Sequence, residues 1–360
     1  MNFASDNGAG AAPEILQAIA ASSRVNAPAY GADDYTRRAT AMLSDVFETR
    51  TQAFLVATGT AANALALASL AKPFGAVFCH EEAHIHDDEC GGPEFYTGGA
   101  KLVGIAGKDG KIKPDALREA LGRFPSGLVK SSQPCALSLS QATEAGTIYR
   151  TGEIEELCDI AHAAGIGAHM DGARLANALA ASGVSPAEMT WRAGIDVLSL
   201  GATKNGALAC EAVVFFDTAH AENFAYLRKR GGHTLSKGRF LGAQMEAYLS
   251  DGLWLRLARK ANAAARRLGA ELAKAPGLRL VWPIEANEVF VIAPIATVDA
   301  WRAAGVSFHE WSTRCVASGN APHAGETLVR LVASFDTSAD EIDRLLALCG
   351  HAEITHGAAP

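Results

Sequence analysis

The sequence predicts an α/β fold: a large domain with a mainly parallel sheet between helices, followed by a smaller α+β domain. Short apolar runs alternate with helical periodicities over the first two thirds of the chain, an alternation typical of a parallel sheet covered by helices. Two of these runs, at 165–168 and 195–200, end abruptly in polar clusters, as buried parallel strands do. The 360 residues allow about two domains, which we expect at 1–245 and 246–360.

The elements of the large domain follow in chain order. A glycine-rich extended arm comes first, and a turn at 30–34 separates the first two helices. Apolar spacing predicts helices at 13–23, 36–48, 64–70, 115–124, 152–164, 175–181 and 185–193. Continuous apolar runs predict strands at 54–57, 76–79, 101–105, 165–168 and 195–200.

The small domain is expected to begin after a long helix. The stretch 241–274 has alanine-rich and basic faces, and we expect it to be a long helical stretch that bridges to the smaller domain. Strands are then expected at 278–281, 288–292 and 328–333, with a closing helix at 339–348.

Composition excludes several classes of protein. With 49% hydrophobic and 20% charged residues, the chain is typical of a soluble globular enzyme. A net charge of −7 without a basic cluster argues against a nucleic-acid partner. No segment reaches the roughly 18 apolar residues of a membrane span, and the N-terminus lacks the features of a signal peptide. Seven cysteines without a Cys-x-x-Cys pair read as reduced thiols, so we expect a cytoplasmic protein.

The two polar clusters offer a carboxylate and an amine. HMDGAR at 169–174 contains Asp171, and GATKNG at 201–206 contains Lys204. Each segment alone could be an ordinary turn or a solvated loop. Because the residues between them read as helical, one βαβ crossover would set the two strands side by side. A lysine that holds an aldehyde as a Schiff base and a carboxylate that keeps a pyridine nitrogen protonated are what a pyridoxal phosphate enzyme needs.

A phosphate site is expected at Thr58–Asn63. Small residues at this corner between a strand and a helix leave backbone N–H groups free at the positive end of the helix. Such a corner can receive the phosphate of a cofactor.

The segment 82–92 is rich in residues that can bind a metal. Its His-x-His pair, His84 and His86, suggests zinc or iron. The rest of the chain offers no second compact set of ligands, and adjacent acidic residues often form a solvated helix start. We therefore predict no metal and expect the His84 imidazole to lie against an aromatic cofactor.

Together these motifs resemble the low-specificity L-threonine aldolases, which are pyridoxal phosphate enzymes of the aspartate-aminotransferase fold type, fold type I. The resemblance rests on 169–174, on TKNG at 203–206, on 58–63, on AH at 83–84 with DECGG at 88–92, and on Tyr30-Gly31. It runs from about Ser5 to about Asp336, over almost the whole chain.

The resemblance implies a role for each motif. Lys204 binds the cofactor aldehyde, Asp171 pairs with the ring nitrogen and His84 stacks on the ring. The other residues assigned to the cofactor are Gly59, Thr60 and Ala61 for the phosphate, Arg174, and Lys229 and Arg239, which resemble residues that reach the phosphate of a neighbouring subunit. For Lys229 and Arg239 a solvated basic face is an equal alternative. The resemblance also implies a homodimer or homotetramer with a shared site.

A substrate carboxylate needs a basic partner. Arg330 lies in an otherwise apolar strand, where an unpaired charge is costly, so it needs an anion. A planar guanidinium is the best partner for a carboxylate. The resemblance implies that Arg330, Arg174 and Ser5 bind the carboxylate of an amino acid, and it adds Tyr30 to the substrate site.

One motif departs from the family. Some members carry a histidine in a Thr-His-Asn-Gly turn near the substrate, where this chain has Thr143-Glu144-Ala145-Gly146. Glu144 either replaces that histidine or faces solvent. The base that deprotonates a β-hydroxyl therefore stays open among His84, His86, Glu144 and a water molecule.

The sequence thus predicts a carbon–carbon lyase that cleaves L-threonine, L-allo-threonine and related β-hydroxy-α-amino acids, such as phenylserine, to glycine and an aldehyde. The alternatives are a β-eliminating lyase or an aminotransferase on the same fold, since fold does not determine chemistry, and a cofactor-binding regulator without turnover. The threo/erythro preference, the aldehyde, the choice between dimer and tetramer and any cation requirement stay open.

Overall fold

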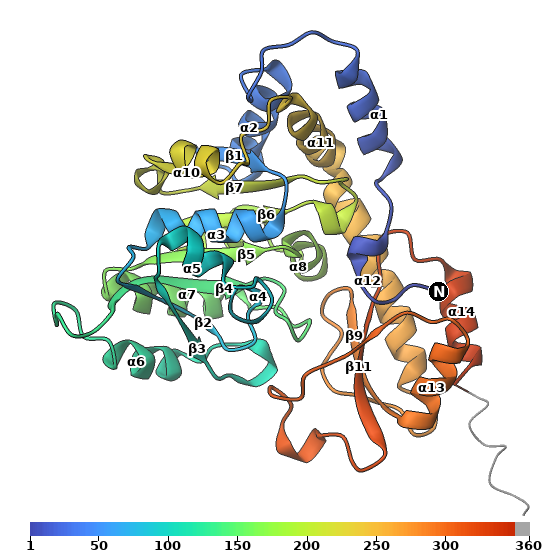
Figure 1. The fold of residues 1–360 in the computed structure, drawn as a ribbon. Coiled ribbons are helices and arrows are strands. Elements are labelled where there is room, and N and C mark those ends of the chain that lie inside the picture. The colour runs from blue at the N-terminus through green and yellow to red at the C-terminus, as the bar shows by residue number, and fades with distance from the viewer. Residues whose placement is uncertain (350–360) are drawn as a thin grey trace, which may run out of the picture.

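The computed structural model describes residues 1–349 and contains the expected α/β fold with two sheets (Figure 1). The large sheet has the order β1-β7-β6-β5-β4-β2-β3. Its strands are β1 (Gln52–Val56), β2 (Gly75–His80), β3 (Lys101–Ile105), β4 (Gln133–Ser140), β5 (Gly167–Gly172), β6 (Val197–Gly201) and β7 (Glu211–Phe215). Only β7 runs against its neighbours, so the expected mainly parallel sheet is confirmed.

Helices cover both faces of the large sheet. One face packs against α6 (Pro114–Gly122), α7 (Thr151–Ala163) and α8 (Leu175–Ser182). The other face packs against α3 (Gly59–Leu70) and α10 (Phe224–Arg230), with α5 (Gly92–Thr97) outside α3. Because both faces are covered, strands such as β2 and β7 are buried along their whole length. This explains why the sequence of β2 reads as a continuous apolar run.

A helical layer extends the large domain beyond β1. It consists of α1 (Pro13–Ser23), α2 (Asp34–Val46) and α11 (Arg239–Leu249), which pack on one another at the top of Figure 1. The short helices α4 (His84–Asp87) and α9 (Pro186–Met189) complete the domain.

The small domain is an antiparallel sheet with helices on one face. Its order is β10-β11-β9-β8. The strands are β8 (Arg279–Leu280), β9 (Glu288–Pro294), β10 (His309–Glu310) and β11 (Glu326–Val332), and the helices are α12 (Leu253–Leu272), α13 (Ile295–Ala303) and α14 (Ala339–Ala347). The helices pack on one face of this sheet, while the other face carries Phe290 and Leu328 toward Ala145 of the large domain.

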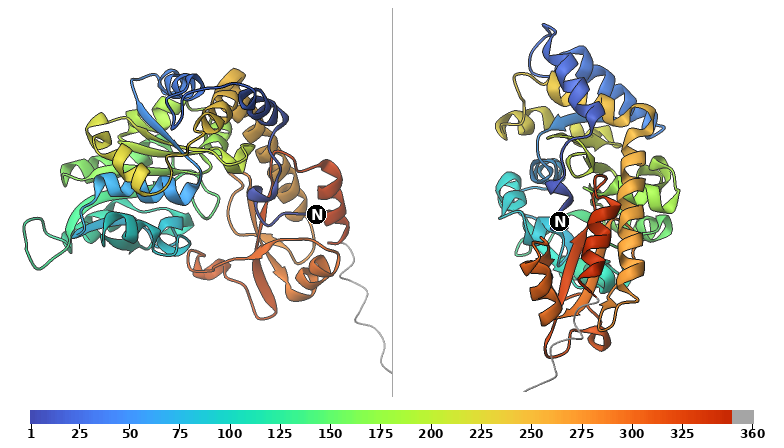
Figure 2. Two further views of the ribbon diagram at one scale, coloured as in Figure 1. Left: turned by 45° about the horizontal axis from the view of Figure 1, so that its top comes forward. Right: turned by 90° about the vertical axis from the view of Figure 1, so that its right-hand side faces the viewer.

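Two features bind the domains together. The long helix α12 packs on both α8 and β9, and Asn262 and Asn177 hydrogen-bond across the first of these contacts. The N-terminal residues also cross over, because Phe3 exchanges backbone hydrogen bonds with Ser307 and Val332 of the small domain. Figure 2 shows this end of the chain beside the small domain. The division at 245/246 remains a prediction.

The long helical stretch expected over 241–274 is interrupted by a turn. Residues Ser250–Gly252 form a 3-10 turn between α11 and α12, in which Asp251 and Gly252 have positive φ values of 51° and 65°. Positive φ ends a right-handed helix, and the chain changes direction there. The apolar spacing continues through the turn, so periodicity alone did not reveal it.

Further differences concern single elements. The expected helix at 185–193 is the short α9 followed by a 3-10 turn at Trp191–Ala193. Strand β4 was not expected, because its proline and serines weaken the apolar signal, although it lies in the middle of the sheet. Strand β7 was also not expected.

Among the described residues, no helix is long and apolar enough to cross a membrane.

Candidate active site

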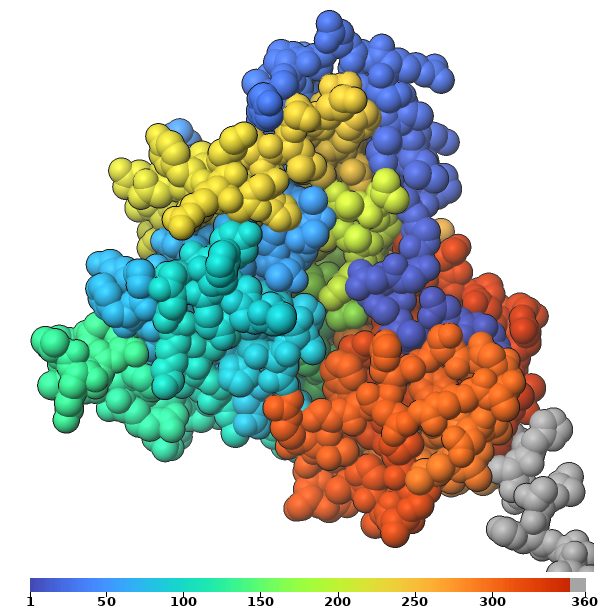
Figure 3. All heavy atoms as spheres, in the orientation of Figure 1, coloured from blue at the N-terminus to red at the C-terminus, as the bar shows by residue number. Residues whose placement is uncertain are grey.

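A cavity of about 680 Å³ lies where the carboxyl ends of β4, β5 and β6 face the small domain. Parallel sheets bind ligands at this edge, and the volume is typical of a site for a small molecule. In the space-filling view the N-terminal residues, in dark blue, lie along the junction of the two domains (Figure 3). The cavity is lined by these residues named from the sequence: Ser5, Gly59, Thr60, His84, Glu144, Asp171, Arg174, Lys204 and Arg330.

The prediction that the strand carrying Asp171 and the strand before Lys204 lie side by side is confirmed. Strands β5 and β6 pair directly, with Asp171 opposite Ser199. The Asp171 carboxylate accepts hydrogen bonds from Nδ2 of Asn63 at 2.8 Å and from the N–H of Ala173 at 3.0 Å. These bonds hold the carboxylate in one orientation at the floor of the cavity.

Lys204 lies in a tight turn, Thr203–Asn205, directly after β6. Glu211, at the start of the neighbouring strand β7, accepts a hydrogen bond from the N–H of Ala202 at 2.7 Å. Burial raises the pKa of Glu211 to about 7, although the nearby Lys204 ammonium opposes the shift. Asn205 fixes the other end of the turn by donating to Tyr248 and to the carbonyl of Trp254. The lysine is thus presented from a rigid turn.

The start of α3 is shaped to receive an anion. The first N–H groups of a helix have no acceptor within the helix, and Thr58 satisfies only that of Ala61, through its Oγ1 at 3.2 Å. Gly59 and Thr60 line the cavity, whereas Ala61 does not. A Cβ added at Gly59 would meet nothing within 4 Å, so there is open space above this backbone.

His84 is held from behind by Glu89. The His84 Nδ1 and Glu89 Oε1 are 2.9 Å apart, and Nδ2 of Asn63 donates to the same oxygen at 2.9 Å. The hydrogen bond to Glu89 raises the pKa of His84, while burial raises the pKa of Glu89. A proton on Nδ1 leaves Nε2 free to accept another. Asn63 thus links the His84–Glu89 pair to Asp171.

The reading of the acidic residues after His84 as a solvated helix start is wrong for Glu89. Its side chain is fully buried, because it lies against Asn63 of α3. The neighbouring Asp87 does lie near the surface, where it pairs with Arg314. Local sequence does not distinguish the two, since only packing against α3 buries one of them.

Glu144 lines the cavity and does not face solvent. Its Oε1 accepts from Oγ of Ser140 at 2.7 Å and from the N–H of His84 at 2.9 Å. No hydrogen-bond partner is found for its buried Oε2 within the described chain. Burial raises the pKa of Glu144 to about 7, and the nearby Asp171 adds to the shift. Glu144 can therefore gain or lose a proton near neutral pH.

Arg174 and Arg330 lie close together but differ in how many of their hydrogen-bond donors are used. Arg174 donates from Nε and Nη2 to both oxygens of buried Asp6, at 2.8 and 3.0 Å. Arg330 stacks on Trp311, with its Cζ 3.9 Å from the ring centroid, and its Nε has no partner among the described residues. Arg330 thus retains donors for a ligand, whereas those of Arg174 largely serve Asp6. Ser5 lies beside Asp6 and accepts from the N–H of Asn7.

Five residues named from the sequence do not line the cavity of this chain: Tyr30, Ala61, His86, Lys229 and Arg239. Tyr30 is 56% exposed, and the Lys229 ammonium lies 5.0 Å from its ring centroid. Arg239 donates from Nε to the carbonyl of Ser22 and stacks on Phe240.

Sequence reasoning gave no individual role to several polar residues of the cavity. Asn63 and Glu89 lay inside motifs that it singled out, whereas Glu211 and Glu288 were not named at all. Asn63 lies in an otherwise apolar helix, while Glu211 and Glu288 each begin an apolar strand. A polar residue inside an apolar element is costly unless it has a partner. That signal, which singled out Arg330, applies equally to these positions.

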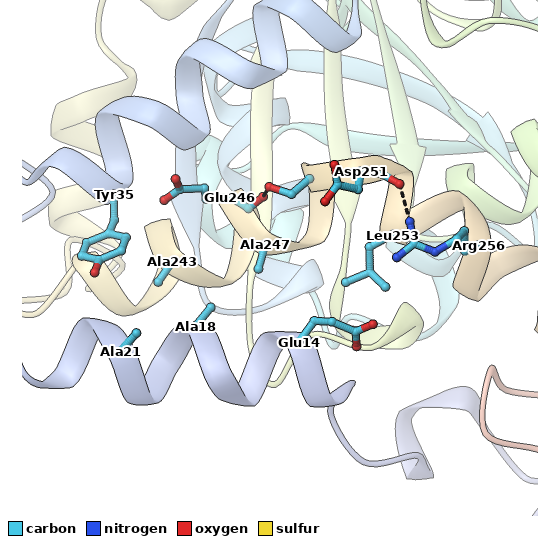
Figure 4. A pocket seen from close by; sticks show the side chains of 11 residues that line it. Glu14, Ala18, Ala21, Tyr35, Ala243, Glu246, Ala247, Asp251, Leu253 and Arg256 are labelled. Atoms are coloured by element: carbon cyan, nitrogen blue, oxygen red, sulfur yellow. Dashed lines mark hydrogen bonds between the residues drawn. The ribbon is translucent and has the colours of Figure 1, made fainter.

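A second hollow lies away from this site, between α1, α11 and the start of α12 (Figure 4). Small alanines such as Ala18 and Ala243 and the carboxylates of Glu14 and Glu246 line it, and it contains none of the residues named from the sequence. Within residues 1–349 no three His, Cys, Asp or Glu side chains are grouped as metal ligands.

The residues of the main cavity fit pyridoxal phosphate. Gly59 and Thr60 at the helix start suit the phosphate, Asp171 suits the ring nitrogen and Lys204 suits the aldehyde. Each group has its chemical complement on a separate element of one cavity.

Comparisons with known proteins agree with this fit. The model of the beta-eliminating lyase family matches residues 2–295. The chain is 41% identical to the low specificity L-threonine aldolase of Pseudomonas aeruginosa, over 95% of each chain. It is 40% identical to the enzyme of the same name from a Pseudomonas species, over 96% of each. Its fold is similar to the solved threonine aldolase of Leishmania major, with a TM-score of 0.89, 27% identity and coverage of 97% and 98% of the two chains.

Proposed function

The chain belongs to the beta-eliminating lyase family and to the low-specificity L-threonine aldolases, and on this basis we propose how its residues carry out the reaction. It is a pyridoxal phosphate-dependent carbon–carbon lyase that cleaves β-hydroxy-α-amino acids to glycine and an aldehyde. The observation that carries the residue assignment is one cavity shared by Asp171, Lys204 and Arg330, from three separate strands or turns.

Each residue has a defined task. When bound, the cofactor supplies a ring that draws electrons from the substrate α-carbon. Lys204 holds the cofactor covalently, and Asp171, fixed by Asn63, keeps a proton on the ring nitrogen. Arg330 binds the substrate carboxylate through its free donors and thereby orients the Cα–Cβ bond.

We assign removal of the β-hydroxyl proton to His84. Glu89 holds its Nδ1, so Nε2 is the free acceptor on the cavity side. Glu144, which binds the His84 backbone, lies close enough to influence how the β-substituent is placed. His86 is a weaker candidate, since its Nδ1 bonds to Asp87.

Product analysis tests the reaction. The protein is incubated with L-threonine, L-allo-threonine and phenylserine, and the products are identified. Glycine with acetaldehyde or benzaldehyde is expected. A keto acid with ammonia would indicate β-elimination, and a new amino acid would indicate transamination.

We also propose an oligomer in which Tyr30, Lys229 and Arg239 complete the site of a neighbouring subunit. Support comes from their position outside this chain's own cavity, with Tyr30 exposed beside Lys229. Light scattering should give the mass of a dimer or tetramer. Lys204→Ala and Lys229→Ala subunits, each weak alone, should regain activity when co-assembled, because one mixed site is intact. A monomer, or no recovery, would contradict the shared site.

A cytoplasmic location belongs to the same proposal. All seven cysteines are free thiols, five of them buried, which supports a reducing compartment.

A further inference from the structure

Glu288 is a buried carboxylate of the cavity that the reaction above does not use. It begins β9 and lies diagonally across from Arg330 of β11, on the sheet face that points to the large domain. Its side chain is 1% exposed. A Cβ at Gly146 would lie 3.2 Å from that of Glu288, so the turn after Glu144 lies against the base of this side chain.

The carboxylate lies between the two arginines without a hydrogen bond to either. Its Oε1 is 3.6 Å from Nη2 of Arg174 and 3.7 Å from Nη1 of Arg330. Neither of its oxygens has a hydrogen-bond partner among residues 1–349. Charge-assisted hydrogen bonds between arginine and carboxylate are normally about 2.7–2.9 Å long. Glu288 is therefore attracted to this pair of cations but not fixed to it.

The charges around the arginines already balance. Asp6 neutralises Arg174 through two hydrogen bonds, and Glu288 is the carboxylate within 4 Å of Arg330 among the described residues, with Asp6 and Asp88 acting on Arg330 from farther away. The carboxylate of a substrate would be a third anion, beside Asp6 and Glu288, at these two guanidinium groups. Like charges placed together there are costly, so Glu288 and the substrate carboxylate cannot both stay close to Arg330.

We propose that Glu288 is an internal competitor for the substrate carboxylate. It occupies the guanidinium pair while the site is empty and moves aside when an amino acid binds to Arg330. When the substrate binds, its carboxylate replaces Glu288 beside Arg330, and this exchange is complete before the chemical step. Glu288 therefore weakens substrate affinity without changing the chemical step. This inference rests on the proposed role of Arg330.

The test removes the charge of Glu288 in the cofactor-loaded enzyme. Glu288→Gln should lower the KM for L-threonine about tenfold, given the cost of adjacent like charges, with kcat within about twofold. Acetate has a carboxylate but no amine, so its inhibition constant, and its dissociation constant by calorimetry, should fall in parallel. A merely structural role predicts the opposite, since damage to the site would raise KM. Glu288→Ala should also lower the KM for L-threonine and the inhibition constant of acetate, and it replaces the glutamine variant if that variant does not fold.

Glu326→Gln is the matched control. Glu326 lies on β11 with Arg330, but it pairs with Arg279 at 2.7 Å outside the cavity, so both constants should stay at their wild-type values. If the KM for L-threonine and the inhibition constant of acetate are unchanged or higher in both Glu288 variants, the role proposed for Glu288 is wrong, while the role of Arg330 still stands. If Arg330→Leu also leaves KM and acetate inhibition unchanged, the carboxylate does not bind there and the proposed role of Arg330 fails as well.

Discussion

At the scale of single residues, the cavity depends on side chains that hold other side chains. Asn63 uses both protons of its amide, one toward Glu89 and one toward Asp171. A residue of α3 thereby orients both the carboxylate that holds His84 and the carboxylate that we propose faces the cofactor ring. A catalytic group needs such support because small errors in position are costly to rate.

Lys204→Ala tests the covalent bond to the cofactor. No other residue of the turn after β6 carries an amine, so the variant should lose the yellow colour of the purified wild type. Borohydride reduction and peptide mapping of the wild type should locate the cofactor on Lys204. Finding it on Lys229 or Lys237 would contradict the assignment.

His84→Phe and Glu144→Gln separate the two candidate bases. Phenylalanine keeps an aromatic ring against the cofactor but has no proton acceptor, so kcat should fall ~10²-fold, the low end for positioned proton transfer. Glu144→Gln should cost less and mainly change the threo/erythro ratio. Both variants should stay yellow. An unaffected His84 variant would assign the proton to water or His86.

The raised pKa of Glu144 predicts a pH dependence of stability in the cofactor-free protein. The folded carboxyl keeps its proton up to about pH 7, whereas the unfolded one loses it near 4.5. The folded state therefore binds more protons in this window, and stability falls as pH rises through it, by up to about 1.4 kcal/mol per pH unit. Glu144→Gln should flatten the curve of unfolding free energy from pH 5 to 7. An identical slope would show that Glu144 is ionised in the fold.

At the scale of elements, positive-φ residues decide where α11 ends and α12 begins. The turn directs α11 to the large domain and α12 across the small one. A glycine there adopts its left-handed conformation without strain.

Gly252→Ala should therefore destabilise the protein by about 1–2 kcal/mol, because φ is 65° at this position. Nothing lies within 4 Å of the added Cβ, so the effect reports backbone strain alone. Urea unfolding measures it. Gly152→Ala, in the first turn of α7 and also in open space, is the control and should be neutral or stabilising. Equal stability of the two variants would rule out strain at the turn.

At the scale of the whole molecule, the cavity exists only where the two domains meet. The large domain supplies Asp171 and Lys204, the small domain supplies Arg330, and the N-terminal segment supplies Ser5 between them. The helix α12 and the backbone hydrogen bonds of Phe3 to the small domain hold these parts in place.

Arg330→Leu tests the contribution of the small domain. The KM for L-threonine should rise strongly while kcat falls less, because the contact exists in both the ground state and the transition state. Steady-state kinetics with threonine and phenylserine measure both constants. An unchanged KM would remove Arg330 from the site.

The sequence by itself determined the fold class, most elements of the large sheet, and the side-by-side placement of the strands that position Asp171 and Lys204. These follow from local periodicity and from the rule that neighbouring parallel strands end at one edge, which need no knowledge of distant contacts. Only the tertiary structure decided that Glu144 lines the cavity, that Glu89 is buried, that Arg174 is bound by Asp6, and that Glu288 lies between two arginines. These contacts join residues far apart in the chain, and the burial that changes their charge and partners arises only when the two domains close on one cavity.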